Sequence, residues 1–346
     1  MNQLPTINLK KLSEERNVTF IIGNGFDLGL GLKTRYINIY EGYIKSTSSS
    51  ENISKFKSEL AKQESNNYEN WSDFEMGMAE YAKKLSSENE LVECVRDFKG
   101  YMVKHLSIEN GRFLKKLNDD SSYAIEINKE FQRSLKLFYN GLIPNVVNQI
   151  NGILGDYTIN RNYITFNYTD SLEACIALRN KYNTIIEKPP IHIHGRLRED
   201  VVLGIDNIFQ IKNLEYDITE KTKKAFIKTY FNERFDKKRV DDVKEIIRKS
   251  NVICVFGFSM GDSDKTWRCL LKEWLQENSE HHLVLYQYDE AKYNLYNRDE
   301  IMDAEDEAKK TMLDKFAIKD ENILKQIHIP IGFKIFDFYG VEESIF

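Results

Sequence analysis

Two polar side chains that could act on a bound ligand each stand at the end of a short apolar run. Asn167 directly follows residues 163–166, and His194 closes the segment 191–194 in front of a glycine. An amide donates and accepts hydrogen bonds at once, and histidine has the ordinary side-chain pKa nearest neutral pH, as a general base requires. We therefore take His194 as a candidate general base and Asn167 as a candidate ligand contact. The structural alternatives are that Asn167 or Asp170 caps the next helix and that His194 is a core histidine.

A metal site is the other chemistry that the histidines suggest. His192 and His194 are two residues apart, and alternation along a strand would place both rings on one face. Such a pair can bind a metal when carboxylates complete the site. The sequence offers no second cluster of ligands, and its cysteines, at positions 94, 175, 254 and 269, lack Cys-x-x-Cys spacing. We expect no metal, and we interpret the cysteines as buried free thiols.

A glycine-rich turn follows the first apolar run. Residues 18–22 lead into Gly23-Asn24-Gly25-Phe26-Asp27, with more glycines at 29 and 31 and a helix predicted from 35 to 44. Glycine lets a ligand approach the main chain, and N–H groups at a helix start can face a phosphate. The match to Gly-x-Gly-x-x-Gly is incomplete, because Leu28 stands at the third glycine. The alternative is a plain turn whose glycines only relieve crowding.

A second turn of this kind follows residues 252–256. It reads Gly257-Phe258-Ser259-Met260-Gly261-Asp262-Ser263-Asp264 and precedes a helix predicted at 265–276. Two such turns predict two edges of one pocket. The same residues match Gly-x-Ser-x-Gly, the nucleophile elbow of α/β-hydrolases, and Asp289 or Asp303 with His328 follow in the required order. A serine hydrolase is therefore an alternative, although it leaves the first turn, Asn167 and His194 without a role.

The order of apolar runs predicts an α/β fold with a Rossmann-like, mostly parallel sheet, because a strand buried on both faces is continuously apolar. Further strands are expected at 201–206, 283–286 and 334–338. Residues 51–154 have the pattern of amphipathic helices, in which Ser72 and Glu75 match a capping box. We predict a nucleotide-binding domain made of residues 1–50 and 155–346, a helical insertion at 51–154, and a smaller helical cover at 207–250.

Composition limits the partners. The 346 residues carry a net charge of −5 and a pI near 5.8, which argues against general affinity for nucleic acid or anionic membranes. No apolar run reaches membrane-spanning length, and the first residues do not resemble a signal peptide. We expect a soluble, cytoplasmic protein.

Four motifs in this order resemble the AbiH family of bacteriophage abortive-infection proteins. They are Gly-Asn-Gly-Phe-Asp with Gly-Leu-Lys-Thr-Arg-Tyr, then Phe-Asn-Tyr-Thr-Asp-Ser-Leu-Glu, then Ile-His-Gly, then Gly-Phe-Ser-Met-Gly-Asp-Ser-Asp. Lys33 stands where the family usually has proline. The resemblance implies a cytoplasmic antiphage role, with a phage-derived trigger or partner protein as a candidate activator. Self-association is left open.

More distantly, the same order resembles the sirtuin-like fold of bacterial defence NAD hydrolases. That resemblance implies NAD as substrate rather than cofactor, with Asn167 acting at the ribose or on the attacking water and His194 as base. Asn24, Asp27 and Thr169 depart from its motifs, and paired zinc cysteines are absent, so deacetylation is not expected. The implied nucleotide-binding residues are Gly23, Asn24, Gly25, Phe26, Asp27, Gly31, Thr34, Gly257, Ser259, Asp262 and Asp264. A non-catalytic nucleotide sensor is a further alternative.

Overall fold

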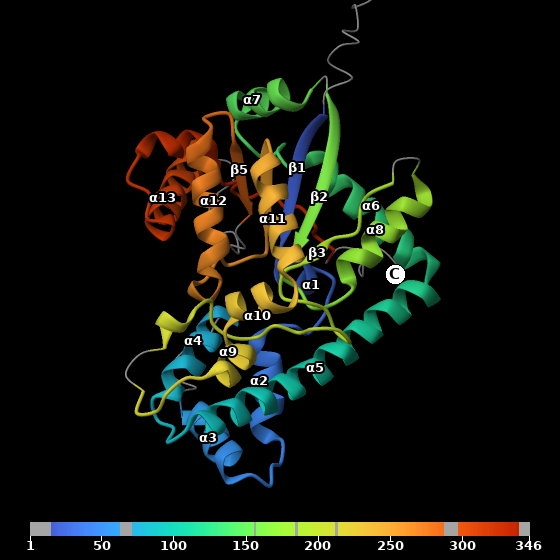
Figure 1. The fold of residues 1–346 in the computed structure, drawn as a ribbon. Coiled ribbons are helices and arrows are strands. Elements are labelled where there is room, and N and C mark those ends of the chain that lie inside the picture. Colours follow the sequence, from blue (N-terminus) through green and yellow to red (C-terminus); the bar gives the residue numbers. More distant parts are fainter. Residues whose placement is uncertain are drawn as a thin grey trace, which may run out of the picture.

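The computed structural model describes residues 15–62, 71–155, 157–183, 186–211, 214–286 and 297–338. A six-stranded parallel sheet lies at its centre, in the order β3-β2-β1-β4-β5-β6 (Figure 1). The strands are β1 (Glu15–Ile22), β2 (Thr158–Thr165), β3 (Ile191–His192), β4 (Val252–Phe256), β5 (His282–Tyr286) and β6 (Ile327–His328). This is the doubly wound order of nucleotide-binding folds. The predicted Rossmann-like sheet with a large helical insertion is confirmed.

Burial on both faces explains why the central strands are continuously apolar. Phe20 of β1 lies opposite Tyr163 of β2 and Cys254 of β4, and all three side chains are buried. On one face Phe20 packs beside α6 (Ser121–Leu137), α7 (Pro144–Leu154), α8 (Ser171–Tyr182) and the last turns of α5 (Glu88–Asp119). On the other face Ile21 packs beside α11 (Lys237–Lys249), α12 (Lys265–Glu277) and α13 (Arg298–Phe316). Helices on both faces thus shield the central strands from solvent.

A second apolar cluster lies beyond the carboxyl ends of the strands. It joins α2 (Tyr36–Lys45), α3 (Glu51–Lys62), α4 (Trp71–Ala82) and the first half of α5 to α9 (Glu220–Phe226). The strands point toward this helical group, and α5 runs along it from end to end (Figure 1). The helix α10 (Lys228–Phe235) follows α9 directly. The carboxyl edge of the sheet therefore lies beside a layer of helices.

Two predicted strands are wrong. Residues 201–206 form no ladder; Ile205 makes one isolated bridge, to Ile227, and its neighbours pack into the second apolar cluster. Residues 334–338 are also outside any strand, since Phe336 has a φ of 51° and packs with Phe338 against the α6 face of the sheet. The last strand is instead β6, which pairs with β5. Both runs are apolar because they are buried, and burial alone does not provide a strand partner.

Candidate functional site

The two glycine turns touch each other at the carboxyl edge of the sheet. Gly23 N donates to Phe256 O at 2.8 Å, and Gly25 N donates to Gly257 O at 3.1 Å. A Cβ added at Gly25 would lie 2.6 Å from the Cα of Gly257, whose own φ is +65°. Only glycine allows backbones to approach so closely. These glycines therefore have a packing role, and the phosphate contact expected of them stays a prediction.

The short helix α1 (Gly25–Gly29) continues the first turn. Phe26 is fully buried and packs edge-on against Phe131 and Phe336, so its side chain belongs to the core. The N–H of Phe26 donates to Gly23 O. Asn24 and Thr34 close the loop, with Thr34 Oγ1 2.6 Å from Asn24 Oδ1. The main-chain donors of this turn are thus largely used within the protein.

Asp27 forms a buried cluster with α8 and the loop before it. Its carboxylate accepts hydrogen bonds from Thr169 Oγ1 at 2.7 Å and Ser171 Oγ at 2.5 Å. Burial raises the pKa of Asp27 to about 6, although the hydroxyls and the Asn167 amide lower it in part. Within the described residues, Asn167 Nδ2 is buried and has no hydrogen bond of ordinary geometry, although its amide is close enough to Asp27 to lower the pKa of that carboxyl. The cluster therefore contains a carboxyl poised to titrate and an amide that faces it.

His194 belongs to a second buried cluster. Its Nε2 lies 2.9 Å from Asp264 Oδ1, and the Lys228 ammonium lies 3.0 Å from the same oxygen. Lys228 also donates to Glu75 Oε2 at 2.7 Å. The four side chains come from α4, the loop after β3, the start of α10 and the short helix η4 (Asp262–Asp264), and each is less than 10% exposed. We call Glu75, Lys228, Asp264 and His194 the charged chain.

Electrostatics in the charged chain favour a neutral imidazole. Burial and the Lys228 cation lower the pKa of His194, more than Asp264 raises it. Burial by itself would raise the pKa of Asp264, but Lys228 and His194 hold it well below its usual range. An ionised carboxylate only accepts, so His194 Nε2 carries the proton and Nδ1 keeps its lone pair. His194 is thus prepared to accept a proton at Nδ1.

The structure pairs His194 with Asp264, which the family resemblance had implied only as a nucleotide-binding residue. The rings flanking Asn167 lie near the imidazole, Phe166 at 5.1 Å and Tyr168 at 6.0 Å between centroids. Within the described chain, no hydrogen bond joins Asn167 to His194; the Asn167 amide influences Asp27 instead. The two catalytic candidates thus belong to neighbouring clusters, and their joint action on one sugar stays a prediction.

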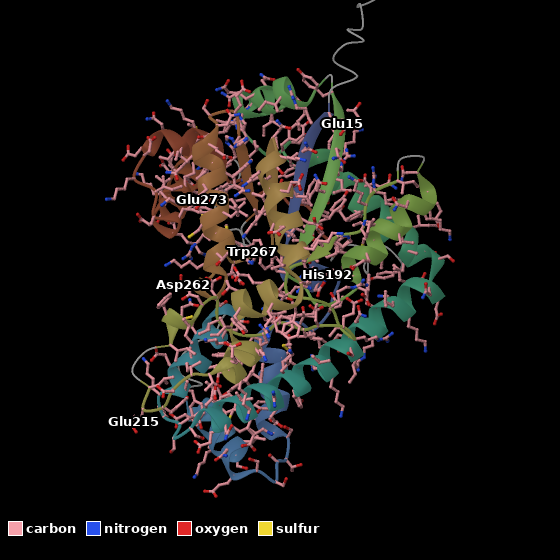
Figure 2. All side chains as sticks on the ribbon, in the orientation of Figure 1. Glu15, His192, Glu215, Asp262, Trp267 and Glu273 are labelled. Carbon is pink, nitrogen blue, oxygen red and sulfur yellow. The ribbon has the colours of Figure 1, made fainter. Side chains whose placement is uncertain are left out.

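The expected strand alternation of His192 and His194 is wrong, because β3 ends at His192. His192 Nδ1 donates to Asn167 O at 2.8 Å, and its Nε2 pairs with Glu173 (the region is marked by the His192 label in Figure 2). The chain then turns at Gly195, whose φ is +74°. Across the described ranges, no group of three or more His, Cys, Asp or Glu side chains could hold a metal ion. Three of the cysteines are buried, but Cys269 is exposed, contrary to expectation.

Glu75 and Lys228 were missed by sequence reasoning. Glu75 was interpreted as part of a capping box, and Lys228 lies in a segment interpreted as a solvated cover; both side chains are buried. The one local signal is that Lys228 directly follows the apolar pair Phe226 and Ile227. The contact between Glu75 and Lys228 joins residues 153 positions apart, and no local sequence pattern reveals it.

The elbow residues do not form a serine triad with His328. Ser259 is exposed, and its carbonyl accepts a hydrogen bond from Lys315. His328 is buried on β6 with Nε2 2.8 Å from His282 Nδ1, and burial lowers its pKa to about 3. Asp303 is exposed on α13, and Asp289 lies outside the described residues. Asp262 is also exposed and pairs with Arg268 at 2.8 Å.

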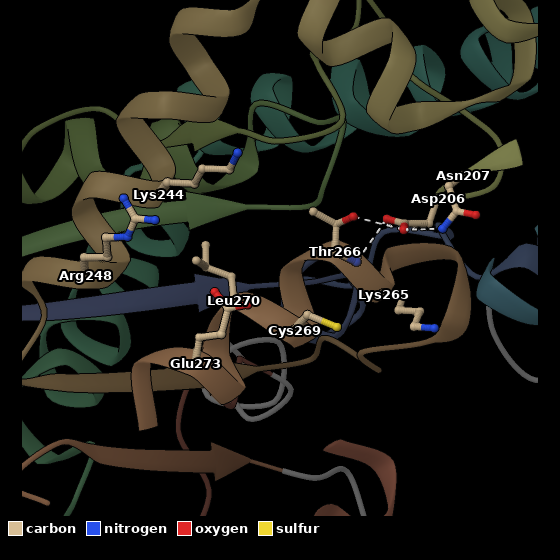
Figure 3. Close-up of a pocket in the computed structure, with 9 residues that line it drawn as sticks. All are labelled: Asp206, Asn207, Lys244, Arg248, Lys265, Thr266, Cys269, Leu270 and Glu273. Carbon is tan, nitrogen blue, oxygen red and sulfur yellow. Dashed lines mark hydrogen bonds between the residues drawn. The ribbon is translucent and has the colours of Figure 1, made fainter. Parts of the chain in front are cut away.

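A groove of about 400 Å³ lies between α11, α12 and the loop at Asp206 (Figure 3). Lys244, Arg248 and Lys265 line it together with Asp206 and Glu273, so its lining contains both cations and carboxylates. Asp206 binds the start of α12 through Thr266, at 3.1 Å from its N–H and 3.0 Å from its hydroxyl. None of the catalytic or nucleotide-binding residues predicted from the sequence lines this groove.

Comparison with known proteins supports one assignment. The model of a family described as "Bacteriophage abortive infection AbiH" matches residues 19–286. No curated protein matches the chain. Of the helices in the described ranges, none combines the length and the apolar character needed to cross a membrane.

Proposed function

Because this chain belongs to the AbiH family of bacteriophage abortive-infection proteins, we propose that it is an effector that hydrolyses NAD at the nicotinamide–ribose bond. The observation that carries the proposal is the buried His194–Asp264 pair. The pair joins the loop after β3 to the short helix after β4, and these strands lie on either side of β1, where the strand order reverses. Ligands of open α/β sheets bind at such points.

The reaction needs little from the protein beyond orientation and a proton acceptor. The bond from ribose C1′ to the pyridinium nitrogen breaks, and nicotinamide leaves with the bonding electron pair as a neutral molecule. Water oxygen bonds to C1′, and one proton of that water passes to His194 Nδ1. Asp264 accepts the Nε2 hydrogen bond and stabilises the imidazolium that forms. No general acid is required, because the pyridinium nitrogen is cationic before cleavage and becomes neutral when it takes the bonding electron pair.

Asn167 is assigned to orient the ribose hydroxyls or the attacking water. Support for this comes from its buried Nδ2, which among the described residues has no hydrogen bond of ordinary geometry and which a substrate oxygen would satisfy. Asp27, with its raised pKa, lies in the same cluster and would accept from a sugar hydroxyl. A pyrophosphate at the glycine turn would need donors other than the N–H groups of Gly23, Gly25 and Phe26, since these already bond to carbonyls.

The test is incubation of the full chain with NAD, followed by chromatography of nicotinamide and ADP-ribose. His194→Ala and Asn167→Ala should each reduce turnover by at least roughly 100-fold, the size of a general-base or orientation effect. His281→Ala removes a histidine that is also buried but bonds to Trp274 O, and it should retain turnover. Ser259→Ala should retain it too.

An effector that destroys a central metabolite must be inactive before infection, so the assay is repeated in lysate from phage-infected cells. Nicotinamide release that needs the wild-type chain supports the proposal. Release from His194→Ala and Asn167→Ala at the wild-type rate contradicts the proposal. So does the absence of release from the wild-type chain both as purified protein and in lysate from infected cells. Loss of release in Ser259→Ala alone would assign the reaction to the elbow serine.

A further inference from the structure

We propose that Lys228 and Glu75 are positioning residues for His194: Lys228 fixes Asp264 against the imidazole, and Glu75, from the helical insertion, fixes Lys228. The link to turnover rests on the proposed function. The effect on the His194 side chain does not, because it is a property of the charged chain itself.

The contacts of the charged chain leave each member little freedom. Glu75 Oε1 accepts from Gly204 N at 3.1 Å, and Glu75 Oε2 accepts from Lys228 at 2.7 Å. The Lys228 ammonium reaches Glu75, Asp264 and, at 3.5 Å, Ser263 Oγ, so its three donors are all directed. Asp264 Oδ1 is shared between Lys228 and His194. A movement of Lys228 therefore acts on the oxygen that holds the imidazole.

Energetics favour a positional role. An ammonium that is 4% exposed is stable only with counter-charges, and the pKa of Lys228 stays high because Asp264 and Glu75 outweigh the cost of burial. Lys228 has one positive charge between two carboxylates. Burial raises the pKa of Glu75, and Lys228 opposes this by stabilising the carboxylate. Within the charged chain, the carboxylates of Asp264 and Glu75 thus compensate the Lys228 ammonium, and His194 does not need to carry a charge.

The remaining groups that face His194 do not replace this effect. Arg239 of α11 lowers the pKa of His194 less than Lys228 does, and it is already paired with Asp200 at 2.9 Å. Tyr168 contributes a neutral ring, since burial raises its pKa well above the ordinary value. Asp264 pulls in the opposite direction, toward imidazolium. Lys228 is therefore the main charge that keeps the ring neutral and able to accept a proton.

This assignment gives the helical insertion a chemical role. Glu75 lies on α4, which packs with α2, α3 and α5 rather than on the sheet. Separation of α4 from α10 would remove one of the two carboxylates that hold Lys228. The position of the insertion is thereby coupled to the protonation of the base.

The experiment follows the His194 ring by NMR in histidine-labelled full-length protein, with its signal assigned by loss in His194→Gln. Lys228→Met should raise the apparent pKa of His194 by about one unit or more, because a cation is removed and Asp264 is left uncompensated. Arg179→Met is the matched control: it breaks another buried ion pair, Arg179–Glu187 at 2.9 Å, and should leave the His194 titration unchanged.

Glu75→Gln is the second variant, used also if Lys228→Met does not fold, because it preserves volume while it removes the charge. Its amide oxygen can replace only one of the two acceptors that now bind Gly204 N and Lys228. It should lower the apparent pKa of His194 by less than one unit, since Lys228 then acts on Asp264 alone. If the wild-type protein releases nicotinamide, the pH profile of kcat/KM should shift to higher pH in Lys228→Met. A shift of the His194 titration in these two directions supports the inference, even when no chain turns over NAD. An unchanged titration in both variants, or an equal shift in Arg179→Met, overturns it.

Discussion

Asp27 and Asp264 are buried aspartates in the loops that follow the adjacent strands β1 and β4, yet they differ in their partners and their acidity. Asp27 is 2% exposed and accepts hydrogen bonds from two hydroxyl groups, and its pKa is raised to about 6. Asp264 is 7% exposed and lies beside Lys228 and His194, and its pKa is lowered. Neutral donors offset part of the cost of burying a carboxylate, whereas a cation more than offsets it.

The difference in acidity suits the two aspartates to different roles at the carboxyl edge of the sheet. An aspartate that stays ionised can hold a histidine in a fixed orientation, as Asp264 does. An aspartate that titrates near pH 6 can exchange a proton or a hydrogen-bond role with a ligand. Three substitutions test this comparison, from the largest expected effect to the smallest.

Asp264→Asn should destabilise the fold by about 3–5 kcal/mol at neutral pH, as expected when one partner of a buried ion pair is lost. Asp27→Asn should be as stable as wild type or more so, because it removes a charge that is buried without a cation. Urea unfolding followed by circular dichroism measures both free energies. Equal losses in the two variants would show that partner charge does not distinguish the two sites.

The pH dependence of stability should have opposite signs at the two aspartates. The folded chain binds the Asp27 proton more tightly than the unfolded chain, with a pKa of about 6 against 3.8. Stability is therefore lost as the pH rises from about 4 to 6, by roughly 3 kcal/mol. The lowered pKa of Asp264 gives stability that is present above about pH 4 and lost as the pH falls below it.

The measurement is urea unfolding of both variants at a series of pH values. The Asp27→Asn protein should gain on wild type between about pH 4 and pH 6, and the deficit of Asp264→Asn should shrink below about pH 4. Parallel stability curves for Asp27→Asn and wild type would mean that Asp27 titrates with its ordinary pKa.

Asp262→Asn should change stability by less than about 0.5 kcal/mol, because the Asp262 side chain is 67% exposed and solvent screens its ion pair with Arg268. Asp262 stands two residues before Asp264, and the sequence gives the two aspartates the same predicted role. Thermal unfolding in low and high salt measures the effect. A loss as large as that of Asp264→Asn would show that position in the turn, rather than burial, decides the cost.

The sequence predicts the sheet better than it predicts the site. Strands β1 and β4 are recognisable because burial on both faces demands continuous apolar residues. Strands β3 and β6 have two residues each, too few for any pattern. At the site, the choice of His194 as a catalytic candidate follows from its residue type and its place close after a short apolar run, but its partners do not follow from the sequence. In the sequence, Glu75 and Lys228 have the pattern of solvent-exposed residues, because their ion pair forms only when α4 and α10 pack together in the fold.

The helix α5 has a consequence for how this chain could be divided or recombined. Its 32 residues extend for about 48 Å at 1.5 Å per residue. Its first half contributes Val95 and Phe98 to the cluster beyond the strands, and its last turns contribute Phe113 and Leu117 to one face of the sheet. Excision of residues 51–154 would therefore uncover Phe20 as well as remove Glu75. The helices can be exchanged between relatives only together with the sheet face that they cover.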